Sequence, residues 1–386
     1  MATRMIYWID LNRFDTKPDK STWLEMAHEL NRNGFEAQII TSFEHKPFEP
    51  KHHNVRVVSI KAIRTTALFR ISLLFKAVYF LIKKCDRNSI VIIPVAGLLA
   101  VPILQIFRFH NIHLDVRTLP VTVRGAKRKL DKLIFWDFAL RYFAKPSLTY
   151  SFITERLKAE VERVAKTSFP EACIWTSGVN GSLFQQTSNK SNNLDGTTPY
   201  NVFYHGTVMK DRGVFDVVEA IKMLHDRSSL SVTFTIVGSG PDLRELADWI
   251  RNEAFARSVS IVGLVPYESV PLFIATADCC VCPLPPRPEW QVSSPLKLFE
   301  YMAMAKPIIA TRIAAHQDVL EGQEFVVWTG GHDAFNFAKA IEFAYLNRHT
   351  LATAAKNGPL LVSKRYDWNI IGQHFGHFLK DRYGTS

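Results

Sequence analysis

The chain has 386 residues, of which 47% are hydrophobic and 22% are charged, a composition that excludes wholesale disorder and suggests about two domains. Lys and Arg number 47 against 36 Asp and Glu, but residues 61–145 alone hold 16 basic and 4 acidic side chains. A basic segment in an otherwise balanced chain predicts an anionic partner, which is nucleic acid, a membrane surface or an acidic ligand.

The first half of the chain alternates strand-like apolar runs with helical patterns, which is typical of a parallel, doubly wound sheet. The 18 uncharged residues from Ile90 to Phe107 are long enough for a membrane span. Because Pro94, Gly97 and Pro102 interrupt them, a buried strand followed by a buried helix is the preferred interpretation. Strands are expected over residues 5–10, 36–41, 55–60, 89–94, 112–119 and 148–154, and helices over 21–34, near 66–85, after Gly97, near 127–144 and over 155–165.

The second half repeats this pattern after a polar stretch from Asn180 to Pro199, which is typical of a linker. We therefore expect an N-terminal domain over 1–178, a linker over 179–200 and a C-terminal domain over 201–366. Two doubly wound domains that face each other would place a ligand in the cleft between them. Strands are expected over residues 201–206, 231–238, 259–265, 279–284 and 307–311, and helices over 213–226, 242–254, 268–277 and 295–305, followed by two further helices.

The five cysteines and the first residues of the chain predict a cytoplasmic protein with reduced thiols. The odd, scattered count argues against a disulfide framework. Cys279, Cys280 and Cys282 lie in one expected strand, where neighbouring side chains point to opposite faces and cannot converge on one metal ion. Residues 1–15 lack the apolar core and the small-residue cleavage site of a signal peptide.

The segment SSPLKLFEYMAMAKPIIAT, residues 293–311, is the most informative for chemistry. Ser294 suits the N-cap of a helix and Pro295 suits its first position, which places the cation of Lys297 in the first turn, where the helix dipole favours anions. A bound diphosphate would resolve this conflict, and Glu300, one turn on, could accept hydrogen bonds from a ribose. The alternative is a surface Lys–Glu pair between these two residues.

Two further segments follow strand ends. In YHGTVMKDRG a strand ends at Gly206, and Lys210 and Arg212 stand before a helix that opens at Gly213, where they could clamp an anion. The alternative is a solvated basic loop. The turn at Gly238 in IVGSGP lacks the third glycine of a dinucleotide fingerprint, and no P-loop pattern occurs in the sequence.

Taken in chain order, these segments, together with GLVPYESVPLFIATADCCVCPL and KRYDWNIIGQHF, resemble the retaining glycosyltransferases of family 4. The resemblance covers most of residues 201–383 and is thinner in LNRNGFEAQIIT, LDVRTLP and SGVNGSLF of the first half. It implies an α/β protein of the GT-B fold, with two doubly wound Rossmann-like domains facing across a cleft. The C-terminal domain would bind a nucleotide-diphosphate sugar, carried by UDP or GDP, and the N-terminal domain the acceptor. A last helix over 367–386 would cross back to the N-terminal domain.

The resemblance also assigns roles to individual residues. Arg212 and Lys297 match basic residues that bind diphosphate, Glu300 matches the second glutamate of a Glu-x7-Glu motif that contacts ribose, and Gly263 and Leu264 match the turn that flanks the base. The donor-binding residues implied in this way are Gly206, Thr207, Gly238, Gly263, Leu264, Pro295, Leu298 and Glu300.

The sequence departs from the family pattern at three places. Val292 stands where the first glutamate of the motif belongs, and Thr207 stands where many members have a diphosphate-binding arginine. The family's N-terminal catalytic histidine has no obvious counterpart, but Arg117, with Asp115 beside it, lies near its expected place. The candidate catalytic residues are therefore Arg212, Lys297, Asp115 and Arg117.

The resemblance implies sugar transfer with retention, by a hexosyltransferase in which the leaving diphosphate helps to deprotonate the acceptor hydroxyl. Arg212 and Lys297 would supply positioning and charge stabilisation, and neither a metal nor another cofactor is expected. Two alternatives remain. A GT-B sugar-nucleotide epimerase would need acid and base carboxylates in the cleft, and a catalytically silent nucleotide-sugar-binding protein would fit the missing glutamate and histidine.

The basic block suggests where the acceptor comes from. Residues 61–84 place Leu68, Ile71, Leu74, Phe75 and Val78 along one helical stripe with basic residues around it, and residues 124–145 open with a basic cluster that continues into aromatics. Such segments suit a peripheral contact with an anionic membrane on its cytoplasmic face, and hence a glycan or lipid-linked acceptor of polysaccharide biosynthesis. The alternative is that the stripes are core faces and the lysines are solvated. No nucleic-acid partner is expected, because no helix-turn-helix or base-stacking motif accompanies the charge.

Overall fold

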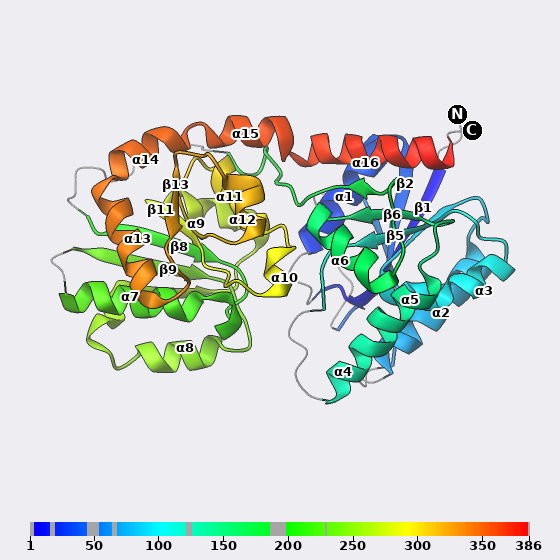
Figure 1. The fold of residues 1–386 in the computed structure, drawn as a ribbon, viewed down its shortest axis with the longest axis horizontal. Coiled ribbons are helices and arrows are strands. Elements are labelled where there is room, and N and C mark those ends of the chain that lie inside the picture. Colours follow the sequence, from blue (N-terminus) through cyan, green and yellow to red (C-terminus); the bar gives the residue numbers. More distant parts are fainter. Residues whose placement is uncertain are drawn as a thin grey trace. The chain divides into compact units, whose positions relative to one another are not determined.

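The chain forms two compact units in the computed structural model, which describes residues 4–15, 20–44, 54–63, 68–120, 126–185, 198–227 and 230–384. Unit 1 comprises residues 1–176 and 368–386, and unit 2 comprises residues 177–367. Each unit has a parallel sheet with helices on its faces (Figure 1). Residues 186–197 of the predicted linker lie outside the described residues.

The sheet of unit 1 has seven parallel strands in the order β3-β2-β1-β4-β5-β6-β7. The chain runs outward from β1 in one direction and then returns to add β4 and its successors on the other side, which is the doubly wound arrangement. Central strands such as β4 are apolar throughout because helices cover both faces. The strands are β1 Arg4–Arg13, β2 Phe35–Ser42, β3 Arg56–Ser59, β4 Ile90–Ile93, β5 Ile112–Val116, β6 Thr149–Phe152 and β7 Cys173–Ile174.

The apolar run 90–107 does not form one continuous helix in unit 1. It divides into β4, a 3-10 turn over Val95–Ala100 and a short helix over Val101–Ile106, so the run is interrupted as Pro94, Gly97 and Pro102 predicted. The expectation that this helix is buried is wrong, because only Val101 and Leu104 are buried and Ile106 is 77% exposed. Among the described residues, no helix is both long and apolar enough to cross a membrane. The helix expected near 127–144 contains a π-helical segment, Leu133–Phe138. The α-helices are α1 Lys20–Arg32, α2 Phe69–Lys84, α3 Val101–Ile106, α4 Ala126–Lys132, α5 Ala139–Phe143, α6 Glu155–Ala165 and α16 Trp368–Tyr383.

Helix α16 belongs to unit 1 although it ends the chain. It packs closely on α1, because Gly372 has no side chain where a Cβ would lie 2.3 Å from Cβ of Glu29. Gly376 lies in the same way against Asn33. Two glycines one turn apart on α16 therefore form the surface on which α1 lies.

Unit 2 has a six-stranded parallel sheet in the order β10-β9-β8-β11-β12-β13. The expectation of two helices between residue 311 and the last helix is wrong in number, because the chain there forms β13 and the four helices α12 to α15. The strands are β8 Tyr200–His205, β9 Val232–Val237, β10 Val259–Gly263, β11 Cys279–Cys282, β12 Ile308–Thr311 and β13 Val326–Thr329. The helices are α7 Val214–Arg227, α8 Leu243–Ile250, α9 Val270–Ala275, α10 Pro288–Gln291, α11 Leu296–Ala303, α12 Ala314–Leu320, α13 Ala334–Leu346, α14 Arg348–Ala355 and α15 Gly358–Arg365.

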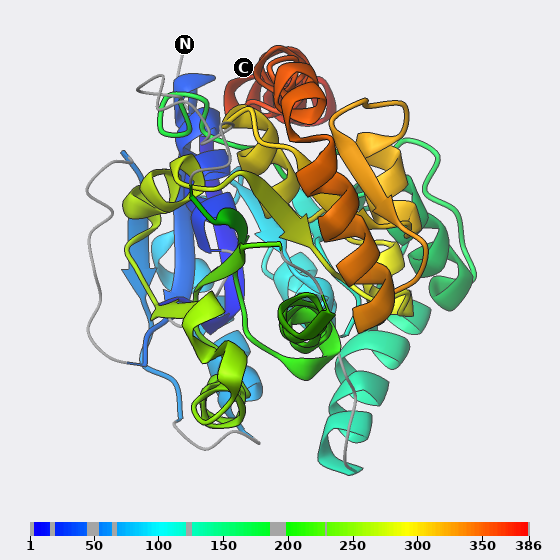
Figure 2. The same cartoon turned by 90° about the vertical axis from the view of Figure 1, so that its left-hand side faces the viewer.

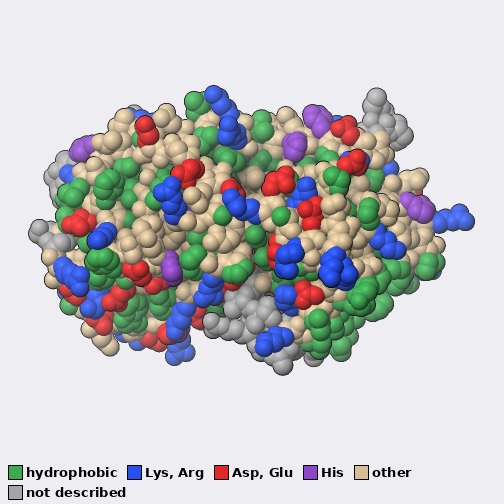
Figure 3. All heavy atoms as spheres, in the orientation of Figure 1, with side chains coloured by type: hydrophobic (Ala, Val, Ile, Leu, Met, Phe, Trp, Pro, Cys, Tyr) green, Lys and Arg blue, Asp and Glu red, His purple; other side chains and the backbone are tan. Residues whose placement is uncertain are grey.

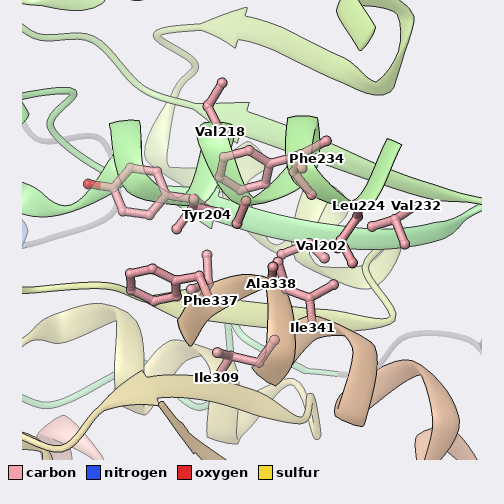
Figure 4. Packing of buried hydrophobic residues seen from close by; sticks show 14 of the residues in the cluster. Val202, Tyr204, Val218, Leu224, Val232, Phe234, Ile309, Phe337, Ala338 and Ile341 are labelled. Carbon is pink, nitrogen blue, oxygen red and sulfur yellow. The ribbon is translucent and has the colours of Figure 1, made fainter. Parts of the chain in front are cut away.

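Apolar side chains of the sheet and of two helices build the core on one face of unit 2. Val202 of β8 and Phe234 of β9 meet Val218 of α7 and Ile341 of α13 (Figure 4), and α7 and α13 lie side by side (Figures 1 and 2). Strand β11 is fully buried as the cysteine run predicted. This core holds the strands rigidly, so the loops at their carboxyl ends have a fixed scaffold.

Candidate functional site

The candidate site lies at the carboxyl edge of the unit 2 sheet, beside β8 and β11, where the strand order reverses. In doubly wound sheets this is where ligands bind. The loops after β8 and β9 are in backbone contact there, because a Cβ on Gly238, whose φ is 142°, would lie 2.0 Å from the Gly206 carbonyl oxygen. The predicted positions Gly206 and Gly238 are therefore brought together, and only glycine fits at Gly238.

Lys297 lies in the first turn of α11, as predicted, and its side chain is only 8% exposed. Its ammonium has no hydrogen-bond partner among the residues that the structure describes. The Nζ atom lies 4.1 Å from the ring centroid of Tyr204, and a Cβ added to Gly206 would lie 3.2 Å from it. A buried, unpaired cation is costly for the fold. Its position beside a bare glycine backbone and a helix N-terminus suits an anionic ligand.

The predicted start of this helix needs a correction. Helix α11 begins at Leu296, and Pro295 occupies the N-cap with an extended ψ of 114° instead of the first helical position. Ser294 does not cap the helix, because its hydroxyl accepts a hydrogen bond from the Ser177 N–H (3.1 Å) and its carbonyl accepts one from the Ser177 hydroxyl (2.8 Å). The amide hydrogens of the first turn therefore have no side-chain cap, which leaves them available to a ligand.

Arg212 lies in the 3-10 turn Lys210–Arg212 that follows β8. Its guanidinium lies over the Trp290 ring, with Cζ 4.6 Å from the centroid, and its Nε is buried without a hydrogen-bond partner in the described part of the chain. The indole of Trp290 is itself fixed, because its N–H donates to the Asp211 carbonyl at 3.1 Å. Arg212 is thus a second cation in a fixed position after β8. The alternative of a freely solvated basic loop is wrong for this residue.

Arg212 and Lys297 both act electrostatically on Cys282 at the end of β11. Burial raises the pKa of the Cys282 thiol to about 11, and both Lys297 and Arg212 partly oppose that rise. The thiol itself stays protonated at neutral pH, so Cys282 takes no part in the chemistry of these cations.

Glu300 also lies in α11 and is 1% exposed. Its Oε2 accepts a hydrogen bond from Nε2 of His205 at 2.6 Å, and its Oε1 accepts one from the Tyr267 hydroxyl at 2.8 Å. The alternative of a solvated surface pair between Lys297 and Glu300 is therefore wrong, because both side chains are buried. A carboxylate oxygen that accepts one hydrogen bond keeps a second acceptor position.

The other predicted donor positions differ in exposure. Gly263 ends β10 with a φ of 87°, and the next residue, Leu264, is 82% exposed, so an apolar side chain is available beside this edge of the sheet. Thr207 follows Gly206, and its carbonyl accepts a hydrogen bond from the Tyr204 hydroxyl at 2.8 Å. Leu298 is fully buried in the apolar core of unit 2, so its side chain packs under the site.

The predicted residues Asp115 and Arg117 belong to unit 1. Asp115 is buried at the end of β5 and accepts a hydrogen bond from the Ser151 hydroxyl at 2.7 Å. The Arg117 guanidinium lies over the Trp175 ring, with Cζ 3.3 Å from the centroid, and donates to the Trp175 carbonyl at 2.6 Å. Both side chains therefore have partners within unit 1, and neither belongs to the cluster of unit 2.

Sequence reasoning missed the residues that hold the site together. His205 is the last residue of β8, directly before Gly206, so its place at the carboxyl end of a central strand was a usable signal. Tyr267 lies in a 3-10 turn and Trp290 in the one-turn helix α10, and their contacts depend on how these short elements pack over the sheet. In the described ranges, no group of three or more His, Cys, Asp or Glu side chains is arranged to hold a metal ion.

Comparisons with known proteins agree with this picture. Residues 199–347 match the family described as Glycosyl transferases group 1, and no curated protein matches the chain. Sucrose-phosphate synthase from Thermosynechococcus elongatus is similar with a TM-score of 0.80 at 18% identity, over 99% of this chain and 100% of that chain. HepE from Anabaena, solved with UDP-glucose, has a TM-score of 0.75 at 16% identity, over 98% and 99%. WaaG, a glycosyltransferase of lipopolysaccharide biosynthesis, has a TM-score of 0.71 at 12% identity, over 97% and 99%.

These identities show the fold alone. The predicted GT-B fold, with two parallel-sheet Rossmann-like units, is confirmed because all three structures match along nearly their whole length. The family match covers most of unit 2 and ends before α14. It includes Arg212, Lys297 and Glu300.

Proposed function

We propose that this protein is a retaining glycosyltransferase of family 4 type that moves a sugar from a nucleotide-diphosphate sugar to a glycan or lipid-linked acceptor. The observation that carries the proposal is the Lys297 ammonium, which is buried beside Gly206 and has no hydrogen-bond partner among the described residues. A diphosphate would give that ammonium its missing acceptors, and the Arg212 guanidinium would bind the same anion. The match of residues 199–347 to group 1 glycosyltransferases supports the proposal.

The proposed mechanism relies on charge and position. As the bond between sugar and diphosphate breaks, negative charge grows on the leaving diphosphate, and cations fixed in a buried site stabilise it without having to reorganise. Lys297 and Arg212 supply this charge, so no metal ion is required by the proposal. Glu300 accepts hydrogen bonds from the ribose and fixes the nucleotide. The leaving diphosphate helps to deprotonate the acceptor hydroxyl, and Asp115 and Arg117 of unit 1 are proposed to act on the acceptor.

We place the acceptor at an anionic membrane surface, on its cytoplasmic side. The stripe predicted on α2 is divided in the structure, because Leu74 and Val78 are buried whereas Leu68, Ile71 and Phe75 are exposed. The apolar surface continues on α3 and on the segment from α4 to α5 (Figure 3). Its most exposed members are Phe75, Tyr79, Ile106, Leu130, Leu133 and Tyr142.

Charges around this apolar surface favour an anionic partner. Asp131 and Asp137 are paired with Arg70 and Lys132, whereas the exposed Lys76, Lys83, Lys84 and Lys129 flank the apolar residues. Basic and aromatic side chains on one face suit the interface of a lipid bilayer. Residues 64–67 and 121–125 and the side chains of residues 126–128, which include part of the predicted basic cluster, lie outside the described residues.

A panel of UDP-, GDP- and ADP-sugars tests the proposal. Thermal shift should find at least one donor that raises the unfolding temperature, and that donor should release free nucleotide when a suitable acceptor is added. EDTA should not abolish the release, because side chains neutralise the diphosphate. Stabilisation without release would favour a silent binding protein, and conversion of the sugar without transfer would favour an epimerase. If no donor stabilises the protein, the donor site is wrong.

A further inference from the structure

Glu300 is held by two donors that come from different elements. Nε2 of His205, at the end of β8, lies 2.6 Å from Oε2, and the hydroxyl of Tyr267, in the turn Tyr267–Ser269, lies 2.8 Å from Oε1. The carboxylate is 1% exposed, so water contributes little to its orientation. The direction in which Glu300 presents its remaining acceptor positions is therefore set by these two neighbours.

The hydrogen bonds around His205 are mutually consistent. An ionised carboxylate only accepts, so Nε2 carries a proton and donates to Glu300. Nδ1 lies 3.2 Å from the Tyr301 hydroxyl, which can donate to it, and the same hydroxyl oxygen accepts the backbone N–H of His205 at 3.3 Å. An imidazole with its proton on Nε2 therefore satisfies each contact, and Tyr301, which is fully buried in the core, fixes the ring.

We propose that His205 is a positioning residue for the ribose of the donor: it holds Glu300 so that the free acceptor positions of the carboxylate receive the ribose hydroxyls. The inference rests on the proposed function and extends it to a residue that touches neither sugar nor diphosphate. Strand β8 also leads directly into Gly206, which lies beside Lys297. The end of this one strand would therefore position the nucleoside through His205 and the diphosphate through the Gly206 backbone and Lys297.

Two substitutions of His205 test the roles of its two ring nitrogens separately. The side-chain amide of glutamine in His205→Gln reaches the place of Nε2 and can still donate to Glu300, whereas asparagine in His205→Asn reaches only the place of Nδ1. We expect His205→Asn to weaken binding of UDP, GDP or ADP, whichever binds the wild type best, by about tenfold, and His205→Gln to stay within about threefold of the wild type. Calorimetric titration of the full chain measures each affinity.

The same nucleotide in its 2′,3′-dideoxy form provides the decisive control. It lacks the hydroxyls that Glu300 would bind, so the wild type and His205→Asn should bind it equally weakly. In a Glu300→Gln background the asparagine substitution should add little further loss. The proposal is overturned if His205→Asn binds the ribonucleotide as the wild type does, or if it loses the ribonucleotide and the dideoxynucleotide to the same extent. A wild type that binds none of the three nucleotides would overturn the proposed function as well, which distinguishes the two failures.

Discussion

Lys297 shows how a residue that is unfavourable for the fold marks a site. The sequence places a cation at a helix N-terminus, and the structure adds that its ammonium is buried and lacks an acceptor among the described residues. The Tyr204 ring recovers part of the cost through a cation–π contact at 4.1 Å. Proteins that retain such a group at the edge of a sheet commonly do so for a ligand.

Buried histidines give the fold an acid sensitivity that can be assigned to single residues. Burial lowers the pKa of His113 in unit 1 to about 3, and both its ring nitrogens are 2.7 Å from hydroxyls of Thr149 and Ser151. An unfolded histidine takes up a proton near pH 6.5, whereas folded His113 stays neutral. The stability that neutral His113 contributes to the fold is therefore fully present above pH 6.5, and it falls as the pH drops toward 3.

We expect His113→Gln to lose less stability than the wild type between pH 7 and pH 5.5. The difference should be about 1 kcal/mol, because His113 becomes mostly protonated in the wild-type unfolded state over this range and the variant has no group at this position to titrate. Urea unfolding at both pH values measures it. Parallel pH dependence of the two proteins would show that His113 is not responsible.

At the level of elements, the close contact between the loops after β8 and β9 sets the geometry of the site. In Gly238→Ala the new Cβ would lie 2.0 Å from the Gly206 carbonyl oxygen, and the φ of 142° is unfavourable for alanine. We expect a loss of more than about 3 kcal/mol in the free energy of unfolding, together with loss of nucleotide binding.

Gly322→Ala is the matched control. This glycine has a φ of 78° and no atom within 4 Å of an added Cβ, so the substitution tests the backbone strain without the collision. It should cost about 1 kcal/mol and leave nucleotide binding unchanged. Equal effects of the two substitutions in urea unfolding would contradict the argument from close contact.

The exposed aromatic residues of α2 give a second prediction at this scale. Phe75 is 61% exposed and Tyr79 is 64% exposed, one turn apart. Changing both to serine should weaken binding to vesicles that contain anionic lipid by at least about tenfold, since each aromatic side chain adds apolar area to the bound state. Co-sedimentation with vesicles measures the bound fraction, and higher salt should weaken wild-type binding.

Phe343→Ser controls for a general loss of exposed apolar surface. Phe343 is 52% exposed on α13 of unit 2, away from the basic block in the sequence, and its replacement should leave vesicle binding unchanged. If the wild type does not bind anionic vesicles, or if the doubly substituted protein binds them equally well, this surface is an ordinary solvated face.

For the whole molecule, apolar periodicity was enough to predict the architecture. Alternating strands and helices identified both parallel sheets, because buried strands and amphipathic helices have distinct periods. Strand β13, Val326–Thr329, was missed although its Val-Val-Trp run is typical of a strand. The helix start at Leu296 differed by one residue because Ser294 binds Ser177, which is remote in the sequence.

The site was predictable only where it lies within one element. Lys297 and Glu300 share a helix, so their spacing already placed them on one face. The partners that decide what each can do come from elsewhere: His205 ends β8, and Trp290 lies in α10. Such contacts depend on how loops pack over a sheet, and no local pattern contains that information.

Binding of nucleotide diphosphate to Lys297→Met tests the central claim most directly. Methionine keeps much of the side-chain volume and removes an unpaired buried charge, so the unfolding temperature should be unchanged or higher. The affinity for the nucleotide diphosphate that binds the wild type best, measured by calorimetry, should fall at least about fiftyfold, as expected for loss of a charge-assisted contact. Unchanged affinity in a folded Lys297→Met protein would contradict the account.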